Sequence, residues 1–443
     1  MAYPPLLALV LHGSQAAAQQ PSQTSGVDPL PPAAENTFDR TKPETFRGRP
    51  KPTAFGEAAL WAPRVLFFPL YVVTEFGLRV PIYAAAEWVD EHHVVPIVDH
   101  FFHPTPDISW FPVFSLDLGA SASFGARVKW KNMGVLGHEM RLSAEAGGED
   151  FWRVTGQDKW EFEPGKYIGV RGDLSSVPNR PFFGMGPRAP NYRVNFKQTR
   201  YDGFLFGGLK ADNHVQLDVA TGMRVEDNTP GWDPSIETAF DLKKIPGFDL
   251  LHLMMVTADL KVDSRQMIEE NGGLRLLGNL TYARDTVVPE RAFVSVSVDL
   301  EGALEVSSPD RVLAARVYTI QTLPLGKEPV PFSHQAMLGW QNHHGFLWGR
   351  FRGESAALGE IHYRYPIAYY VDAQWTASVG NVFGPRFKGF DVGDMTGSIG
   401  VGLRTRRIGE SPIELTFALG TTRFNEALSF DAVRVFFGTV EGL

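Results

Sequence analysis

The stretch that decides the fold is residues 339–374, GWQNHHGFLWGRFRGESAALGEIHYRYPIAYYVDAQ. Glycine and asparagine interrupt its first part, which we expect to be a loop with the run 349–354, GRFRGE, at its tip. Two segments of alternating polar and apolar residues follow, 358–365 and 369–379, and a turn is predicted at Pro366. The stretch therefore predicts a loop followed by a β-hairpin.

The second strand of this hairpin has two different faces. Its polar face carries Tyr370, Asp372, Gln374, Thr376 and Ser378, and its apolar face carries Tyr369, Val371, Ala373, Trp375, Ala377 and Val379. Successive side chains of a strand point to opposite faces. Such a strand needs water on one side and an apolar medium on the other, as in a transmembrane barrel.

The same alternation continues through most of the chain. From Trp110 onward we distinguish about sixteen alternating segments of ~9–14 residues, the length that a tilted membrane strand needs. An even number suits a closed antiparallel barrel. We therefore predict an all-β fold, a transmembrane barrel over 108–443, with its first strand near 111–120 and its last near 430–438. A soluble sandwich or propeller is the alternative, but no repeat of ~40–50 residues is present.

Composition narrows the class of protein. The chain has 443 residues, a net charge of −8, a hydrophobic fraction of 44% and no cysteine. The negative charge argues against a nucleic-acid-binding role. The lack of cysteine excludes disulfides, thiol chemistry and thiolate metal sites.

The N-terminal region differs from the rest. Residues 1–18 are expected to be a signal peptide, because a short apolar core precedes three alanines, although a basic start is missing. Residues 19–54 are rich in Pro, Gln, Ser and Thr and predict a disordered linker. Residues 55–107 predict a helical appendage with helices at 58–73 and 81–93, lying at the membrane interface or the barrel rim. A helical subdomain packed on a soluble core is the alternative.

Several motifs in the barrel region resemble a known family. From about Trp110 to Leu443 the chain is similar to the surface-antigen barrel of the BamA/TamA superfamily, the outer-membrane assembly and translocation barrels. The matching residues are Phe351-Arg352-Gly353 at the loop tip, Gly359-Glu360 in the next strand, Tyr370 and Asp372 in the strand after it, and Phe182-Phe183-Gly184-Met185-Gly186-Pro187 earlier in the chain. Glu354 and Gln374 depart from the family pattern.

The resemblance implies a location, a mechanism and partners. It implies a bacterial outer-membrane barrel that inserts membrane proteins, or translocates substrates, through its lumen and a lateral seam. It also implies that Arg352 on an inward-folded loop pairs with Asp372 and fixes the lumen. Partners would be outer-membrane lipid and unfolded outer-membrane proteins. Residues 19–109 hardly accommodate one POTRA domain, so we expect the subgroup without these domains and a possible separate periplasmic partner.

The seam is predicted from the two terminal strands. Pro112 removes a hydrogen-bond donor from the first strand, and Gly438 weakens the last. We therefore expect a weak closure with Val113 close to Val435, so that cysteines at these two positions would crosslink.

The other functional classes have weaker support. A passive pore and a lipid-handling barrel remain as alternatives to an insertase. We expect no enzymatic activity, no catalytic residue, no cofactor and no metal. His343 and His344 could join a hydrolase site only with a serine and an acid in reach. The side chains that could otherwise bind metal, without a recognised ligand spacing, are Glu91, His92, His93, Asp99, His100 and His103.

Overall fold

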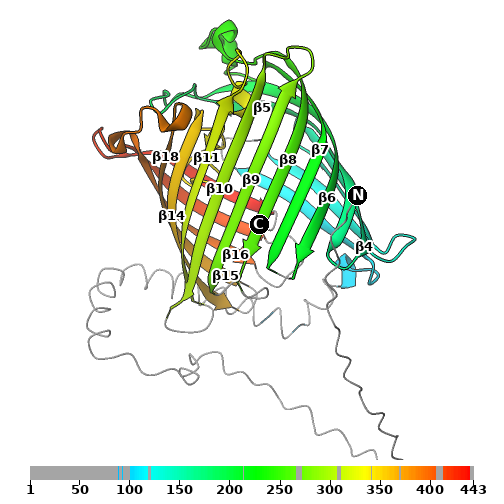
Figure 1. Cartoon of the computed structure of the whole chain (residues 1–443). Coiled ribbons are helices and arrows are strands. Elements are labelled where there is room, and N and C mark those ends of the chain that lie inside the picture. The colour runs from blue at the N-terminus through cyan, green and yellow to red at the C-terminus, as the bar shows by residue number, and fades with distance from the viewer. Residues whose placement is uncertain are drawn as a thin grey trace, which may run out of the picture. The chain divides into compact units, whose positions relative to one another are not determined.

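The barrel is closed and has the predicted number of strands. The computed structural model describes residues 88, 92, 100–117, 121–212, 214–265, 272–306, 311–340, 342–368, 371–405 and 413–439. Within them, sixteen antiparallel strands form one ring in the order β1-β18-β17-β16-β15-β14-β11-β10-β9-β8-β7-β6-β5-β4-β3-β2 (Figure 1). The all-β, sixteen-stranded prediction is therefore confirmed.

The strands follow one another around the barrel as a meander, with one interruption. The barrel strands are β1 (Ile108–Asp117), β2 (Ser123–Lys131), β3 (His138–Ala146), β4 (Trp152–Glu163), β5 (Lys166–Phe182), β6 (Val194–Ala211), β7 (Val215–Pro230), β8 (Leu250–Asp263), β9 (Gly273–Asp285), β10 (Ala292–Glu305), β11 (Val312–Pro324), β14 (Ser355–Ala368), β15 (Val371–Phe383), β16 (Thr396–Thr405), β17 (Ile413–Arg423) and β18 (Phe430–Thr439). The interruption between β11 and β14 holds a separate hairpin of β12 (Ala336–Leu338) and β13 (Phe351–Gly353).

Short 3-10 turns lie in the connections at one end of the barrel. They are η2 (Ile236–Thr238), η3 (Leu242–Lys244), η4 (Phe332–His334), η5 (Pro385–Phe387) and η6 (Val392–Asp394). We call this the long-loop end, because the long β5–β6, β7–β8, β11–β14 and β15–β16 connections all lie there (Figure 1). In the described part of the chain, no helix has the length and apolarity needed to cross a bilayer.

Alternation places apolar side chains outside and polar side chains inside. In β17, Leu415 and Phe417 are 43% and 45% exposed on the outer wall. Glu414 and Thr416, their neighbours in sequence, are buried on the inner side. An outward apolar surface with a polar interior is what a lipid-facing barrel requires. The pattern read from the sequence therefore gave the correct faces.

The strands differ markedly in length. The strands β5, β6 and β7 have 17, 18 and 16 residues, whereas β1, β2 and β3 have 10, 9 and 9. The extra residues of β5 lie at the long-loop end, because positions up to Ser176 pair with β4 and those beyond it pair only with β6. The barrel wall is therefore tall on the β5–β7 side.

Some predicted boundaries need correction. Pro366 does not form a turn but lies within β14. The register of β14 with β15 shifts between Pro366 and Ala368. The first strand begins at Ile108 instead of Phe111. A bulge is a place where a strand tolerates proline, so the proline signal was assigned to the wrong element.

Most of the predictions for the N-terminal region fall on residues that the structure does not describe. The predicted signal peptide and linker, 1–54, lie outside the described residues, as does most of the helical segment 55–107. Of that segment, Trp88 and residues 100–102 are helical. The helical appendage is therefore not confirmed.

The connection between β11 and β14 folds into the barrel, and the apolar core lies where it meets the wall. One cluster joins Phe332 to Phe182 and Phe196, and a second joins Phe346 and Phe351 to β14 and β15. We call residues 325–354 the lumenal loop. Its placement inside the barrel confirms the predicted inward-folded loop.

Candidate functional site

Arg352, at the tip of the lumenal loop, lies in an aromatic cage. The residue is 0% exposed. Its Nη1 donates a hydrogen bond to the carbonyl oxygen of Phe332. Its guanidinium lies 5.1 Å from the ring of Phe332, 5.8 Å from Trp348 and 5.9 Å from Phe182. Burial lowers the pKa of Arg352 to about 9, so the side chain still carries its charge at neutral pH.

The predicted pair between Arg352 and Asp372 is wrong. Ser355, the first residue of β14, pairs with Phe383 at the far end of β15, whereas Asp372 pairs with Pro366 near the other end. Eleven residues of strand separate Asp372 from Phe383, which at ~3.3 Å per residue is ~36 Å. Arg352 at the loop tip and Asp372 therefore lie at opposite ends of the β14–β15 hairpin. The aromatic cage, and not the Asp372 carboxylate, surrounds the guanidinium of Arg352.

Two motif segments that are distant in sequence meet at this cage. The backbone N–H of Gly186 donates to the carbonyl of Arg352 at 2.7 Å, and the ring of Phe182 faces its guanidinium. Gly353 lies so close to β15 that an added Cβ would come within 2.8 Å of the Phe383 carbonyl oxygen. The glycine of the loop motif is thus required by close backbone approach.

His343 anchors the middle of the loop as a neutral imidazole. It is 0% exposed, with Nδ1 2.8 Å from Ser378 Oγ and Nε2 3.0 Å from Thr396 Oγ1. The Thr396 hydroxyl donates to the Gly380 carbonyl, so Nε2–H donates to Thr396 and Nδ1 accepts from Ser378. Burial lowers the pKa of His343 to about 3. Both nitrogens are therefore used in positioning the loop.

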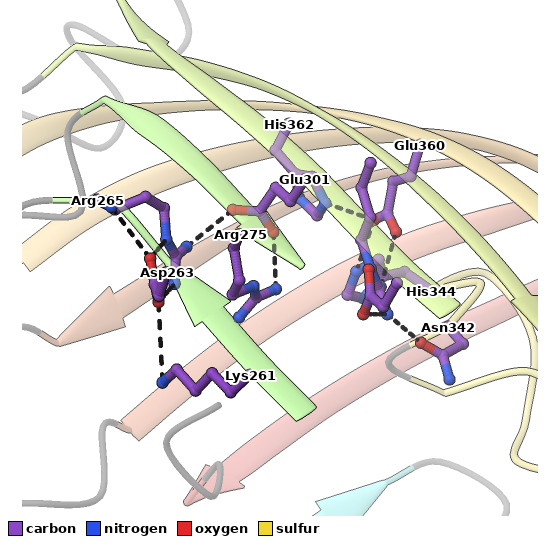
Figure 2. Close-up of polar contacts among 11 residues, drawn as sticks. Lys261, Asp263, Arg265, Arg275, Glu301, Asn342, His344, Glu360 and His362 are labelled. Carbon is purple, nitrogen blue, oxygen red and sulfur yellow. Dashed lines mark hydrogen bonds and ion pairs between the residues drawn. The ribbon is translucent and has the colours of Figure 1, made fainter. Parts of the chain in front are cut away.

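Glu360, predicted from the strand motif, is the centre of a lumenal polar cluster. Its Oε1 lies 3.1 Å from His344 Nε2 of the loop and 3.2 Å from His362 Nε2 of the same strand (Figure 2). Arg316 of β11 lies 3.4 Å from Oε2 and donates to Asn342 Oδ1 of the loop at 2.8 Å. The cluster joins the loop to two adjacent strands by charge-assisted contacts.

A second network lies nearby on the inner wall. Arg265 contacts both Asp263 and Glu301 at 2.9 Å, and Arg275 contacts Glu301 at 2.8 Å (Figure 2). These residues belong to β8, β9, β10 and the β8–β9 connection, with no member from the lumenal loop. We assign this network to cross-strand stabilisation of the wall.

The loop also reaches the strands beside the seam. The Gly345 N–H donates to Ser398 Oγ of β16 at 2.7 Å. Phe346 packs against Gly420 of β17, where an added Cβ would lie 2.5 Å from the ring. Phe332 contacts β5 and β6 on the tall side of the barrel. The loop therefore crosses the lumen near its long-loop end.

Among the described residues, the junction between β1 and β18 has the fewest paired residues of any in the barrel. Within the described residues it has three register pairs, Ser115–Gly438, Leu116–Phe437 and Asp117–Phe436. The other junctions have from eight pairs, at β1–β2, to sixteen, at β6–β7. Fewer ladder hydrogen bonds mean a lower cost of separating the strands.

The residues chosen from sequence for this seam are only partly correct. Gly438 lies in it, opposite Ser115. In the register that pairs Ser115 with Gly438 and Asp117 with Phe436, Val113 and Val435 are not opposite each other. The valine pair was chosen from strand order alone, which does not determine register. The cysteine pair that the register supports is Leu116 with Phe437.

Arg434 of β18 joins the seam to the lumenal loop. Its Nε and Nη2 donate to the carboxylate of Asp117 on β1 at 2.9 and 3.0 Å. Its Nη1 donates to the carbonyl oxygen of His344 at 3.4 Å. The side chains of Arg434 and Asp117 are 4% and 8% exposed. One buried guanidinium on β18 thus contacts both the strand across the junction and the loop.

The remaining predicted residues are in these positions. Gly359 lies in β14 on the outer face beside Glu360, and Tyr370 lies outside the described residues. Among the described residues, no three or more histidine, aspartate and glutamate side chains are arranged to hold a metal ion. Of the six N-terminal candidates, His92, His100 and His103 are described and the others are not.

Sequence reasoning missed the residues that connect the elements. Arg434 and Asp117 stand on the expected polar faces of the first and last strands, and opposite charges in closing strands are a usable signal. The aromatic cage has a weaker signal, because Phe332 lies in a loop whose path the alternation does not predict. Contacts across the lumen depend on how the loop folds in three dimensions, which the alternation of strand residues does not determine.

Comparison with known proteins gives the fold. No protein-family model and no curated protein matches the sequence. The structure is similar to BamA from Haemophilus ducreyi lacking POTRA domains 1–3, with a TM-score of 0.55 and 14% identity over 75% of this chain and 70% of that one. It is also similar to CdiB from Acinetobacter baumannii, with a TM-score of 0.51 and 11% identity over 76% of this chain and 60% of that one. This chain thus spans less than two thirds of the length of CdiB. The chain has the fold of the BamA and CdiB barrels, and its closed sixteen-stranded barrel fits the bacterial outer membrane.

Proposed function

We propose that this chain inserts proteins into the outer membrane, or translocates substrates across it, by parting the junction of β1 and β18. The observation that carries the proposal is the contrast between three register pairs at this junction and eight or more elsewhere among the described residues. A client strand could pair with the exposed edge of β1 or β18, since an open strand edge is a template for another strand. Partners would be outer-membrane lipid, unfolded barrel proteins and a separate periplasmic protein.

The lumenal loop favours this proposal over a passive pore. Phe332 contacts the β5–β6 side of the barrel, and Phe346 packs on β17, six strands away around the ring. A solute passing through the lumen would have to displace these buried contacts. Opening at the seam requires a smaller change, because only one short junction separates.

Arg434 supplies a mechanism for coordinating the loop with the seam. Parting β1 from β18 would remove Asp117 from the guanidinium and leave a buried charge without its partner, which is costly. The His344 carbonyl holds the same guanidinium in place. We propose that a client which displaces the loop loosens Arg434 and so lowers the cost of opening.

A register-matched disulfide tests the proposal. Leu116→Cys with Phe437→Cys places the thiols on opposed residues of β1 and β18, and both native side chains face outward. With the purified chain in liposomes, the oxidised variant should lose insertion of an unfolded barrel protein, and reduction should restore it. Full insertion by a quantitatively oxidised seam would rule out lateral opening.

The matched control is a disulfide at a fully paired junction. Ile361→Cys with Ala377→Cys joins outward residues of β14 and β15 that are also register partners. This crosslink should leave insertion unchanged in both redox states. Steady ion conductance, with no insertion by the wild-type chain, would instead indicate a passive pore.

A further inference from the structure

A pocket at the long-loop end has an unusual cation at its floor. The cavity has a volume of about 220 Å³, and its walls come from the β5–β6 connection, the lumenal loop and β16–β18. At ~30 Å³ per water molecule, this volume holds an oxyanion group with several waters. The residues that matter for its chemistry are Arg350 on the floor and Arg188, Arg423, Glu426 and Asp431 around the rim.

Arg350 is buried without the partners that a guanidinium normally has. It is 9% exposed, and its charge lies over the rings of Phe351 at 4.8 Å and Phe183 at 5.1 Å. Among the described residues, no hydrogen bond or ion pair reaches its guanidinium, and its Nε and Nη1 are shielded from solvent. Nη2 is therefore the atom through which this side chain can meet a pocket ligand. Burial lowers the pKa of Arg350 to about 10, which leaves it protonated at neutral pH.

The rim charges are already engaged. Arg188 pairs with Asp394 at 3.0 Å, and Arg423 pairs with Glu426. Asp431 accepts a hydrogen bond from Asn191 at 2.9 Å and stands in the exposed part of the pocket. Exposed charges are screened by water and salt, whereas the mostly buried cation at the floor is screened much less. An incoming anion would gain most at Arg350.

From this geometry we propose that the pocket binds a phosphate group, which pairs with Nη2 of Arg350. The group could belong to a free phosphate or to a lipid headgroup of the surrounding bilayer. The pocket lies beside the β17–β18 hairpin, where Phe424, Leu428 and Phe430 are 42%, 73% and 58% exposed. These side chains could receive the acyl region of such a lipid. The proposal does not require lateral opening, since it concerns binding to the closed barrel.

Binding of inorganic phosphate to the full chain in detergent tests the site. Arg350→Gln should weaken binding by about tenfold or more, as expected when a charge-assisted hydrogen bond is lost. Arg350→Lys keeps the charge and should retain part of the affinity. Asp431→Asn, at an exposed position, should strengthen binding because it removes a competing carboxylate. Arg386→Gln, an exposed arginine outside the pocket, is the control and should leave affinity unchanged.

A second titration identifies the source of the phosphate. Native mass spectrometry with short-chain phosphatidylglycerol should give adducts that Arg350→Gln loses if the group belongs to a lipid. If Arg350→Gln keeps the lipid adducts but loses phosphate binding, the site binds the free ion instead of a lipid headgroup. If both phosphate and phosphatidylglycerol bind equally well to wild type, Arg350→Gln and Asp431→Asn, the pocket is not a phosphate site.

Discussion

Arg434 of β18 and Asp117 of β1 form a buried, two-pronged ion pair across the one junction of the described barrel that has only three register pairs. A buried pair of this kind is a poor source of net stability, because both charges lose their hydration. The pair does make the closing strands specific, however, because either charge without its partner would be costly inside the barrel wall. The pair therefore determines which strands close the barrel more than how firmly they close.

Removing either partner should weaken the seam. Arg434→Gln or Asp117→Asn should each lower the free energy of unfolding by about 3 kcal/mol, and the double variant should cost less than the sum. The measurement is a double-mutant cycle by thermal unfolding in detergent. The control is Arg224→Gln, which breaks a 2.6 Å pair with Asp202 at the sixteen-pair β6–β7 junction. Only the seam variants should speed disulfide formation between cysteines at 116 and 437.

Arg352 should couple to its aromatic cage and not to Asp372. Arg352→Gln and Trp348→Leu should be non-additive by about 0.5–2 kcal/mol, the range of a cation–π contact. Arg352→Gln and Asp372→Asn should be additive, because a strand length separates them. Strong coupling between Arg352 and Asp372 in the same unfolding measurements would contradict the cage.

His343 should make docking of the loop sensitive to acid. Its folded pKa of about 3 lies below the unfolded value of ~6.5, so its contribution is complete above that value and is lost as the pH falls towards 3. Between pH 7 and pH 5 the loss should be about 2 kcal/mol. The measurement is the difference in unfolding free energy between wild type and His343→Asn at the two pH values. An equal pH dependence in both proteins would show that His343 does not titrate in this way.

Phe346 should anchor the lumenal loop on β17 only if residue 420 is glycine, because the ring occupies the space of a side chain there. Gly420→Ala places a Cβ 2.5 Å from the ring, and such overpacking costs about 1–3 kcal/mol. Trypsin should then cleave the loop faster at its arginines. Gly359→Ala is the matched control, because nothing lies within 4 Å of its added Cβ. Equal cleavage of the two variants would mean that Phe346 does not anchor the loop.

The strands of the barrel wall could be predicted from the sequence, whereas the contacts of the lumenal loop inside the barrel could not. Alternation in segments such as Ile413–Arg423 reflects a local geometry, the two faces of a strand, so strand number and faces could be predicted. The contact of Arg352 with Phe332, and of Arg434 with His344, depends on how a long loop lies in three dimensions. The valine pair failed for a related reason, since a slip in register leaves the alternation of each strand unchanged.

The unequal strands have a consequence for the surrounding lipid. At ~3.3 Å per residue and ~40° of tilt, a nine-residue strand rises ~23 Å, slightly less than the ~25 Å apolar band of outer-membrane barrels. The nine-residue strand β2 adjoins β1, and β3, also of nine residues, adjoins β2, whereas the strands of 16 to 18 residues stand on the far side of β4. A span shorter than the apolar layer favours local thinning of the bilayer along this flank. We therefore expect a thinner bilayer beside the seam before any client arrives, and relief of that mismatch would supply free energy that no side chain has to provide.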